Sequence, residues 1–180
     1  MNDRLIQKLK KIKLIISDVD GVLTDGSIYI GSNGEEMKKF SIEDGAGVAL
    51  ARASGLIIAL LSGRFSSATD IRAKELKIED IYNGMLNKIP AYEELKRKYN
   101  LEDSEIVYIG DGLIDIPVME KAGIPVSVKN AHPTAKETAV YVTDKSGGSG
   151  ALQETIELVL KAQKQYDDAI NKMREKVLNL

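Results

Sequence analysis

The stretch KLIISDVDGVLTDG, residues 13–26, joins a strand of the buried type to a group of carboxylates. Its first five residues are β-branched and almost continuously apolar, which is typical of a strand covered on both faces of a parallel sheet. Asp18, Asp20 and Gly21 follow at once. Like charges at close range repel, and burial raises the cost of each charge. The folded state must therefore compensate this pair, most simply with a bound cation or with a proton shared between the two carboxylates.

Similar apolar runs recur along the chain and alternate with helical patterns. The predicted strands span 13–17, 56–61, 105–110 and 124–128, with an edge strand at 141–143. The predicted helices lie near 45–54, 66–77, 88–99 and 113–122, after a short amphipathic helix at the N-terminus. This alternation predicts an α/β fold with a doubly wound, Rossmann-like parallel sheet.

Residues 26–42 interrupt the alternation. They form two alternating stretches around Asn33-Gly34, and Asn-Gly is a strong hairpin signal. Each predicted arm has an apolar face of two residues: Ile28 and Ile30, then Phe40 and Ile42. Because a lone hairpin is marginal in water, we expect this face to pack, either on its own domain or on another surface.

Composition excludes several functional classes. With 43% hydrophobic and 29% charged residues in 180, the chain is typical of a globular protein rather than a disordered one. The net charge of −2 gives no basic face for nucleic acid, and the absence of cysteine excludes disulfides and thiolate nucleophiles. No apolar run approaches the ~20 residues of a membrane span. We therefore expect a cytoplasmic protein with one domain over 1–163 and a helical tail over 164–180.

Polar motifs follow three of the predicted strands, at the edge where open α/β sheets bind their ligands. They are Asp18 and Asp20, then Ser62, Gly63 and Arg64, then Gly110, Asp111, Gly112 and Asp115. Lys88 opens the helix before the third of these strands. Each motif alone is compatible with an ordinary turn or helix cap. Their common position at one sheet edge indicates a single site.

The residue types in these motifs fit phosphoryl transfer. A carboxylate can attack phosphorus and form an acyl phosphate, which divides one difficult hydrolysis into two easier steps. Mg²⁺ would relieve the repulsion among Asp18, Asp20 and Asp111 while it binds a phosphoryl oxygen. The Ser62 hydroxyl and the Lys88 ammonium can hold the remaining oxygens. A carboxylate two residues after the nucleophile can protonate the leaving alkoxide and then deprotonate the attacking water.

The motifs DVDGVLTDG, SGR, Lys88 and GDGLID resemble motifs one to four of the haloacid dehalogenase (HAD) superfamily phosphatases. With GGSGA at 147–151, the chain from about Lys13 to Gln163 more narrowly resembles the capless members that hydrolyse 3-deoxy-D-manno-octulosonate 8-phosphate (KDO 8-phosphate), a lipopolysaccharide precursor. From its residues alone, GGSGA reads equally well as a phosphate-cradling loop or as a plain loop before a helix.

The resemblance implies a role for each motif residue. Asp18 would be the nucleophile, and Asp20 the general acid/base whose backbone carbonyl also binds Mg²⁺. Asp111 would be a metal ligand supported by Asp115. The residues that would bind the transferring phosphoryl group are Ser62 and Lys88.

The resemblance also implies a binding site for a phosphorylated sugar acid. Its contacts would come from Asp20, Arg64, Arg72, Lys88 and a loop comprising Ser41, Ile42, Glu43, Asp44 and Gly45. Arginine suits such a substrate because its planar fork can make two hydrogen bonds to a carboxylate. Two positions depart from the family pattern, Gly112 where an aspartate is frequent and Gln153 where an arginine is common. We expect these departures to affect metal affinity and substrate choice.

The spacing of the motifs leaves no room for a cap domain, since only about forty residues separate the first two. The resemblance implies a homotetramer in which hairpins and adjoining subunits enclose each site. Near the C-terminus, apolar residues recur at intervals of four and three with one polar interruption: Leu152, Ile156, Val159, Gln163, Tyr166, Ile170, Met173, Val177 and Leu180. One continuous helix here would be roughly 43 Å long. The alternatives are a chain that folds back after Gln163 or is partly disordered.

Three rival functions remain compatible with part of this pattern. One is a phosphatase of another sugar acid, for example a nine-carbon 9-phosphate, although Arg64 favours the eight-carbon sugar. The second is a related domain that serves only in assembly, which the intact Asp18, Asp20, Lys88 and Asp111 disfavour. The third is a signalling receiver domain, whose phosphorylated aspartate follows a middle strand rather than the first.

Overall fold

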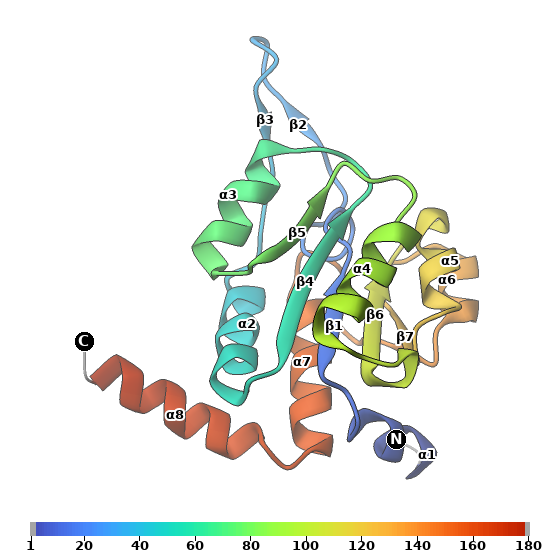
Figure 1. The fold of residues 1–180 in the computed structure, drawn as a ribbon. Coiled ribbons are helices and arrows are strands. Elements are labelled where there is room, and N and C mark those ends of the chain that lie inside the picture. The colour runs from blue at the N-terminus through green and yellow to red at the C-terminus, as the bar shows by residue number, and fades with distance from the viewer. Residues whose placement is uncertain (1–2, 179–180) are drawn as a thin grey trace.

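The structure is a computed structural model that describes residues 3–178. Its helices are α1 (Asp3–Leu9), α2 (Ile42–Ser54), α3 (Ser67–Leu76), α4 (Ile89–Tyr99), α5 (Ile116–Met119), α6 (Pro133–Thr138), α7 (Ala151–Ala162) and α8 (Tyr166–Leu178). Its strands are β1 (Leu14–Ser17), β2 (Tyr29–Ile30), β3 (Glu36–Met37), β4 (Ile57–Ser62), β5 (Asp80–Asn83), β6 (Ile106–Gly110), β7 (Ile124–Ser127) and β8 (Tyr141–Val142). Figure 1 shows their arrangement.

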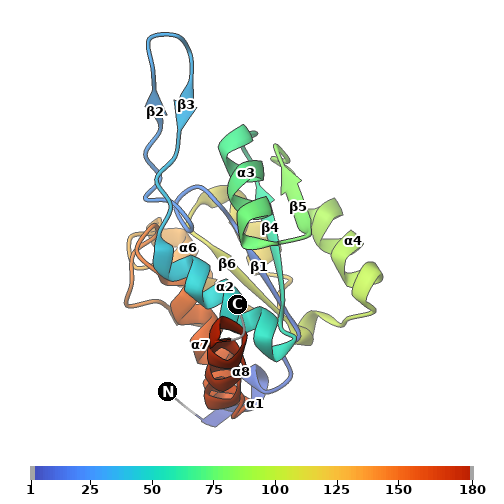
Figure 2. The ribbon, with the colours of Figure 1, turned by 90° about the vertical axis from the view of Figure 1, so that its left-hand side faces the viewer.

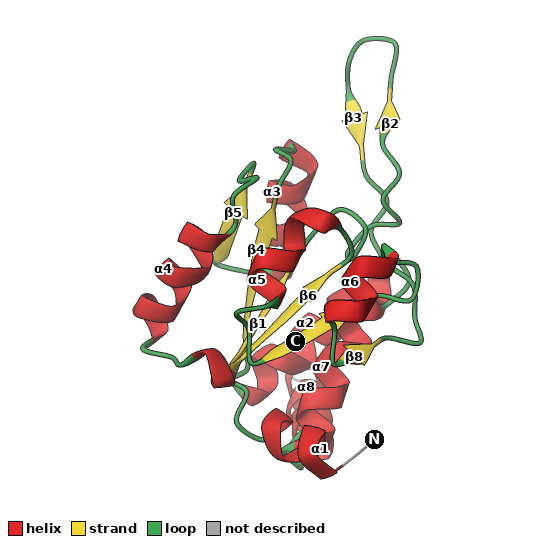
Figure 3. Cartoon of the chain, turned by 90° about the vertical axis from the view of Figure 1, so that its right-hand side faces the viewer, coloured by secondary structure: helices red, strands yellow, loops and turns green. Residues whose placement is uncertain are grey.

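Six parallel strands form the central sheet, in the order β5-β4-β1-β6-β7-β8. Helices α2, α3 and α7 lie on one face (Figure 2), and α4, α5 and α6 on the other (Figure 3). The predicted doubly wound α/β fold is therefore confirmed. Between Asp20 and the start of β4 the described chain holds only loops, the hairpin and α2, so there is no cap domain, as expected.

The central position of β1 explains its composition. Every residue of Leu14–Ser17 is buried, because β4 and β6 flank the strand and helices cover both of its faces. Ser17 pairs in register with Leu60 of β4 and Ile109 of β6. Strand β4 ends at Ser62, two residues after Leu60, and Asp111 follows Ile109 by two residues at the end of β6. The parallel pairing therefore brings the three motifs to one edge of the sheet.

Two elements were not predicted, and one is shorter than predicted. The edge strand β5 is only four residues long, and α6 only six, too short for a clear periodic pattern. The helix expected near 113–122 consists of a single 3-10 turn at Leu113–Asp115 followed by α5. After α5 the chain turns through Gly123, whose amide donates to the Asp103 carbonyl at 2.8 Å.

The predicted hairpin is present as β2 and β3, and it projects away from the sheet (Figure 1). Ile28 is 50% exposed and Ile30 is 69% exposed, so this part of the apolar face does not pack on its own domain. Phe40 does pack against the core. Ile42 was wrongly placed on the second arm, because Ser41 caps a helix that begins at Ile42.

The C-terminal segment is not one continuous helix. It breaks between α7 and α8, where Lys164 adopts a left-handed conformation with a φ of 59°. The side-chain Nε2 of Gln163 donates to the carbonyls of Leu9 and Ile12, which fixes the end of α7 against the N-terminal segment. Of the possibilities left open by the sequence, one continuous helix is excluded, and the chain instead folds back after Gln163.

Helix α8 packs beside α2. Its buried residue is Ala169, and Ile170 and Met173 lie partly buried against the core. The last positions of the predicted seam, the Val177 side chain and Leu180, lie outside the described residues. Within residues 3–178, each helix is too short or too polar to traverse a bilayer.

Candidate active site

The first motif forms a tight loop directly after β1. The amide of Asp18 donates to the Ile109 carbonyl at 2.9 Å, so Asp18 continues the pairing with β6. Its Oδ1 accepts from the amide of Val19 at 2.7 Å. The hydroxyl of Thr24 accepts from the amides of Gly21 and Gly26, both at 3.2 Å. These bonds hold Asp18 at the carboxyl edge of the sheet.

Gly21 lies against the carboxylate of Asp111. A Cβ on Gly21 would lie 2.1 Å from Asp111 Oδ2, and the backbone there has a φ of +87°. Glycine is required for both reasons, since other residues rarely adopt this conformation. The first and fourth motifs are therefore in direct contact, although they lie about ninety residues apart in the sequence.

Three carboxylates converge at this point. Oxygens of Asp18, Asp111 and Asp115 all lie within 4.8 Å of one another. The ammonium of Lys88 lies 2.8 Å from Asp18 Oδ1 and 2.7 Å from Asp115 Oδ1, and its side chain is 0% exposed. Of the carboxylates predicted to share a cation, Asp18 and Asp111 do converge, together with Asp115 and the ammonium of Lys88. The Asp20 side chain does not join them, because it is bonded to Lys38 instead, so that part of the prediction was wrong.

The negative charges of Asp18, Asp111 and Asp115 outnumber the positive charge of Lys88. Burial, followed by the charge of Asp115, raises the pKa of Asp18 to about 8, although Lys88 opposes the shift. Burial and Asp115 likewise raise the pKa of Asp111 to about 6. Burial lowers the pKa of Lys88, but the two carboxylates outweigh it and leave that pKa above its ordinary value. A hard divalent cation with oxygen ligands fits this set of donors and would favour the ionised carboxylates.

Asp115 is bonded on every side. Its Oδ2 accepts from the amides of Asp111 and Gly112, both at 3.0 Å. Its Oδ1 accepts from the Tyr108 hydroxyl at 2.5 Å as well as from Lys88. Lys88 also donates to that hydroxyl at 3.1 Å. Asp115 therefore connects Lys88 and Tyr108 to the backbone of Asp111 and Gly112, and its supporting role in metal binding stays a prediction.

Sequence reasoning missed Tyr108. It belongs to β6, which reads IVYIG and is buried throughout. A buried tyrosine usually finds a partner for its hydroxyl, so a tyrosine in an otherwise aliphatic strand was the available signal. Its hydroxyl contacts both Lys88 and Asp115, which makes it part of the same hydrogen-bonded group.

The second motif lies beside Lys88. Ser62 is the last residue of β4 and is 1% exposed. Its hydroxyl donates to the Arg64 carbonyl at 2.7 Å, and its own carbonyl accepts from the amides of Gly84 and Met85. A Cβ on Gly63 would lie 3.9 Å from Lys88 Cε, which places this loop against the lysine stem.

Asp20 lies apart from the other carboxylates. Its side chain is not a member of the group formed by Asp18, Asp111 and Asp115 within the described chain. Instead, Asp20 Oδ1 accepts from Lys38 Nζ at 2.6 Å. The backbone carbonyl of Asp20 remains the predicted route by which this residue contacts a cation.

Residues Ser41–Gly45, predicted as a substrate loop, form the start of α2. Ser41 is the N-cap, and its hydroxyl accepts from the Glu43 amide at 3.1 Å. Asp44 is buried, and its Oδ1 accepts from the backbone amide of Gln153 on α7 at 3.0 Å. Burial raises the pKa of Asp44 to about 6. Residues 42–45 are therefore helical rather than a loop, with Asp44 facing α7, and substrate contacts by this segment stay a prediction.

Arg72 and Arg64 are both engaged by protein groups. Arg72 Nη2 donates to the Ser41 carbonyl at 2.9 Å, and Nη1 pairs with Glu75 at 2.8 Å, so Arg72 joins α3 to the start of α2. Arg64 forms an ion pair with Glu36 of β3. Substrate contacts by either arginine therefore remain a prediction, and they require exchange of these partners.

The GGSGA segment supports the first motif. A Cβ on Gly147 would lie 1.7 Å from the Gly21 carbonyl oxygen, so no other residue fits there without a shift of the loop. The amide of Gly148 donates to the Val22 carbonyl at 2.9 Å. Of the two alternatives, the contacts favour a loop that packs against the first motif and precedes α7.

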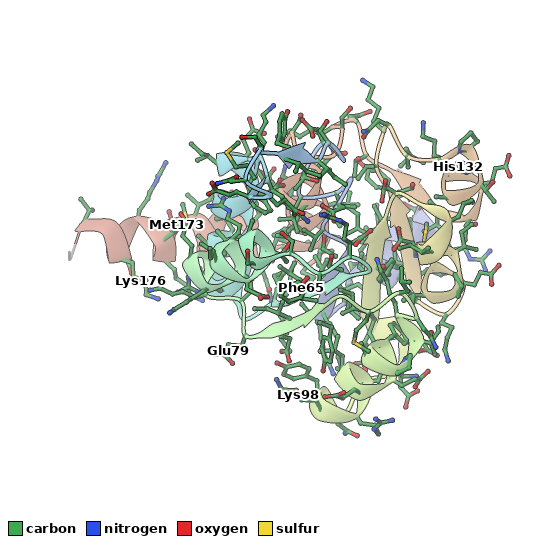
Figure 4. All side chains as sticks on the ribbon, turned by 90° about the horizontal axis from the view of Figure 1, so that it is seen from above. Phe65, Glu79, Lys98, His132, Met173 and Lys176 are labelled. Carbon is green, nitrogen blue, oxygen red and sulfur yellow. The ribbon has the colours of Figure 1, made fainter. Side chains whose placement is uncertain are left out.

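His132 is remote from this chemistry. Its Nδ1 accepts from the Thr134 amide at 3.2 Å and so caps α6. Figure 4 places it at the outer edge of the molecule, whereas Phe65 on the loop after β4 lies nearer the middle. The role of His132 in the structure is therefore that of a helix cap.

The chain is similar to known proteins of one family. Residues 56–154 match the family described as haloacid dehalogenase-like hydrolase. The 3-deoxy-D-manno-octulosonate 8-phosphate phosphatase KdsC of Escherichia coli (strain K12) is 44% identical over 92% of this chain and 88% of its own length. The chain belongs to the haloacid dehalogenase-like hydrolases. The predicted family is therefore confirmed.

Solved structures agree with this assignment. A putative HAD superfamily (subfamily III A) hydrolase from Legionella pneumophila superposes with a TM-score of 0.94 at 39% identity, covering 96% of this chain and 95% of that chain. The 3-deoxy-D-manno-octulosonate 8-phosphate phosphatase from Moraxella catarrhalis, solved with a magnesium ion, a phosphate ion and a KDO molecule, superposes with a TM-score of 0.91 at 42% identity. That match covers 95% of this chain and 98% of the other.

Proposed function

We propose that this HAD hydrolase is a Mg²⁺-dependent phosphatase that converts KDO 8-phosphate to KDO and inorganic phosphate. The observation that carries the proposal is the group of Asp18, Asp111 and Asp115 around one buried lysine, at the sheet edge where α/β folds bind ligands. It is supported by the similarity to the Moraxella catarrhalis phosphatase with magnesium, phosphate and KDO. A place in lipopolysaccharide precursor synthesis and a cytoplasmic location follow from the same proposal.

The reaction proceeds in two displacements on phosphorus. A carboxylate oxygen of Asp18 forms a bond to phosphorus while the bond to the sugar oxygen breaks, and Asp20 gives its proton to that oxygen. Water then attacks the aspartyl phosphate, Asp20 takes the proton from the water, and Asp18 is released with inorganic phosphate. When Mg²⁺ is bound to Asp18, Asp111 and the Asp20 carbonyl, it supplies positive charge for the phosphoryl oxygens.

Lys88 and Ser62 complete the binding of the phosphoryl group. The buried ammonium of Lys88 already faces Asp18, so it is preorganised for the negative charge that develops on the transferring group. The Ser62 hydroxyl exchanges its bond to the Arg64 carbonyl for a phosphoryl oxygen. Arg64 offers its guanidinium to the sugar carboxylate.

The test is phosphate release from a panel of sugar-acid phosphates, with and without Mg²⁺. We expect KDO 8-phosphate to be the preferred substrate and EDTA to abolish turnover. Preference for a nine-carbon 9-phosphate would identify the rival substrate class. Inactivity on the whole panel, in protein that still binds Mg²⁺, would favour an assembly module.

We further propose a homotetramer in which the hairpins contribute to the subunit interfaces. The support is the exposed apolar surface of the hairpin, where Tyr29 is 45%, Ile30 69% and Met37 58% exposed. Such a surface is unfavourable in water unless a partner covers it. In light scattering, Ile30→Glu should shift the protein to smaller species, whereas the control Asp25→Asn should not.

A further inference from the structure

The base of the hairpin reaches into the site. Lys38, one residue after β3, has a side chain that is 1% exposed. Its ammonium lies 2.6 Å from Asp20 Oδ1 and 3.4 Å from the Thr69 hydroxyl on α3. An ammonium taken out of water is costly unless a charge of opposite sign and hydrogen bonds compensate it. Asp20 is therefore the principal partner of this buried lysine.

The position of the Asp20 carboxylate depends in turn on Lys38. The second carboxylate oxygen of Asp20, Oδ2, is buried and has no hydrogen-bond partner among the described residues. The orientation of the Asp20 carboxylate thus depends on the single bond from Oδ1 to Lys38. That bond holds the carboxylate apart from the group of Asp18, Asp111 and Asp115, only two residues away in the sequence.

A second pair connects the hairpin base to the substrate side of the site. Glu36 forms an ion pair with Arg64, while its Oε1 lies 4.0 Å from Lys38 Nζ, beyond hydrogen-bond reach. Charges of alternating sign therefore run from Asp20 through Lys38 and Glu36 to Arg64. The hairpin contributes two of these four groups, so its base is part of the site in the single chain.

We propose that Lys38 is a positioning residue that keeps the Asp20 carboxylate available for proton transfer. This inference rests on the proposed function, in which Asp20 serves the leaving sugar oxygen and the attacking water. Without Lys38, a bound cation would attract the Asp20 carboxylate into the group of Asp18, Asp111 and Asp115. Proton transfer requires hydrogen-bond contact between the Asp20 carboxyl and the reacting oxygen. Moving that carboxyl away would therefore slow both chemical steps at phosphorus. Lys38 itself contacts no reacting atom.

The experiment is a double-mutant cycle with Lys38→Met, Asp20→Asn and the variant that carries both changes. Lys38→Met should lower kcat on KDO 8-phosphate by about 10- to 100-fold, the cost of misplacing a catalytic group, and change KM much less. In the Asp20→Asn background, the same change should lower kcat by less than about 2-fold, because a residue that acts through Asp20 has nothing left to position. Lys38→Arg should retain more activity than Lys38→Met.

Lys39→Met is the matched control. The adjacent Lys39 side chain is 68% exposed and lies 3.9 Å from Asp25, so its removal should leave kcat and KM unchanged. Equal losses from Lys38→Met in both backgrounds would show that the lysine acts independently of Asp20 and would overturn the proposal. A rise in KM alone would assign Lys38 to substrate binding and would overturn it as well.

A measurement that does not depend on turnover separates this inference from the proposed function. In urea denaturation, the combined loss of Lys38 and Asp20 should shift the midpoint by less than the sum of the two single shifts. Additive shifts would show that the two side chains do not interact, whatever the substrate. If the shifts are coupled but the protein does not hydrolyse KDO 8-phosphate, the interaction between Lys38 and Asp20 is supported and the proposed substrate is excluded.

Discussion

The ammonium of Lys88 lies 2.8 Å from the carboxylate of Asp18, and the lysine side chain is 0% exposed. The two residues are seventy positions apart, one after β1 and the other at the start of α4. Asp115 shares this ammonium, and oxygens of Asp18, Asp111 and Asp115 all lie within 4.8 Å of one another. Burial of uncompensated charge is unfavourable for the fold, so this arrangement is a cost that the proposed phosphatase activity explains.

The first prediction concerns the nucleophile. Asp18→Asn should lower phosphate release by about 10⁴-fold or more, as expected when a nucleophile is removed. In EDTA the same variant should unfold at a higher temperature than the wild type, because it removes a buried carboxylate that is repelled by the neighbouring Asp111 and Asp115. Asp25→Asn in the same motif is the control, since its carboxylate is partly exposed and accepts from the Ser27 amide. Turnover that survives Asp18→Asn would exclude the aspartyl-phosphate mechanism.

The second prediction concerns pH and Mg²⁺. Since the folded-state pKa of Asp18 is about 8 and its ordinary value is 3.8, the metal-free native state holds more protons than the unfolded chain between these values. The stability contribution of this group is therefore complete below pH 3.8 and is lost as the pH rises to about 8. Asp111, with a pKa of about 6, adds to the same trend.

Mg²⁺ binds the ionised carboxylates, so it should stabilise the protein more at pH 8 than at pH 5. At a concentration of about 100 times Kd, the gain at pH 8 should be about 2.7 kcal/mol, or about 5–10 °C in Tm. Thermal unfolding in EDTA and in Mg²⁺ across this range measures both trends. Asp111→Asn serves as the control with weakened metal binding. An equal shift in Tm at every pH would argue against cation binding by these groups.

The third prediction concerns Tyr108. Tyr108→Phe removes a buried hydroxyl that donates to Asp115 and accepts from Lys88, so it should cost about 1.5–3 kcal/mol of stability. It should also lower kcat by about 10-fold through misorientation of Lys88. The matched control is Tyr92→Phe, which removes a hydroxyl bonded to Asp103 at 2.7 Å. We expect Tyr92→Phe to lower the stability without lowering kcat. Equal effects of the two variants on kcat would contradict a role for Tyr108 in orienting Lys88.

The fourth prediction concerns Asp44. Its folded-state pKa of about 6 lies above the ordinary 3.8, so its contribution to stability is present below pH 3.8 and lost as the pH rises through about 6. Asparagine reproduces the neutral carboxyl, so Asp44→Asn should be stabilising by ~1–3 kcal/mol at pH 8 and near neutral at pH 4. Urea denaturation at both pH values measures the difference.

Much of the candidate site could be predicted because its residues follow strands. Asp18, Ser62 and Asp111 come directly after buried apolar runs, and parallel strands bring such positions to one edge whatever the details of packing. The glycines of the first motif were equally readable, although only the structure explains Gly21, which lies against the Asp111 carboxylate. The role of Asp115 followed from resemblance, and the structure adds its four donors.

The roles of other residues could not be predicted from the sequence because they depend on packing between distant segments. Lys38 and Glu36 look like surface residues of a hairpin until the hairpin base is placed over Asp20 and Arg64. Asp44 looks like a loop carboxylate until α7, more than a hundred residues later, donates an amide to it. The direction of the chain after Gln163 likewise depends on two carbonyls near the N-terminus.

The sequence by itself determined most of the order of strands and helices, though not β5 or α6, and it placed Asp18, Asp111 and Asp115 at the sheet edge, because periodicity and motif spacing are local properties of the chain. The resemblance of its motifs indicated the family. Only the tertiary structure decided which charges are paired, where the hairpin base lies, and which way α8 turns. Those outcomes depend on burial and on contacts between segments far apart in the sequence. Their energies arise from the removal of charged and apolar groups from water, which no local pattern records.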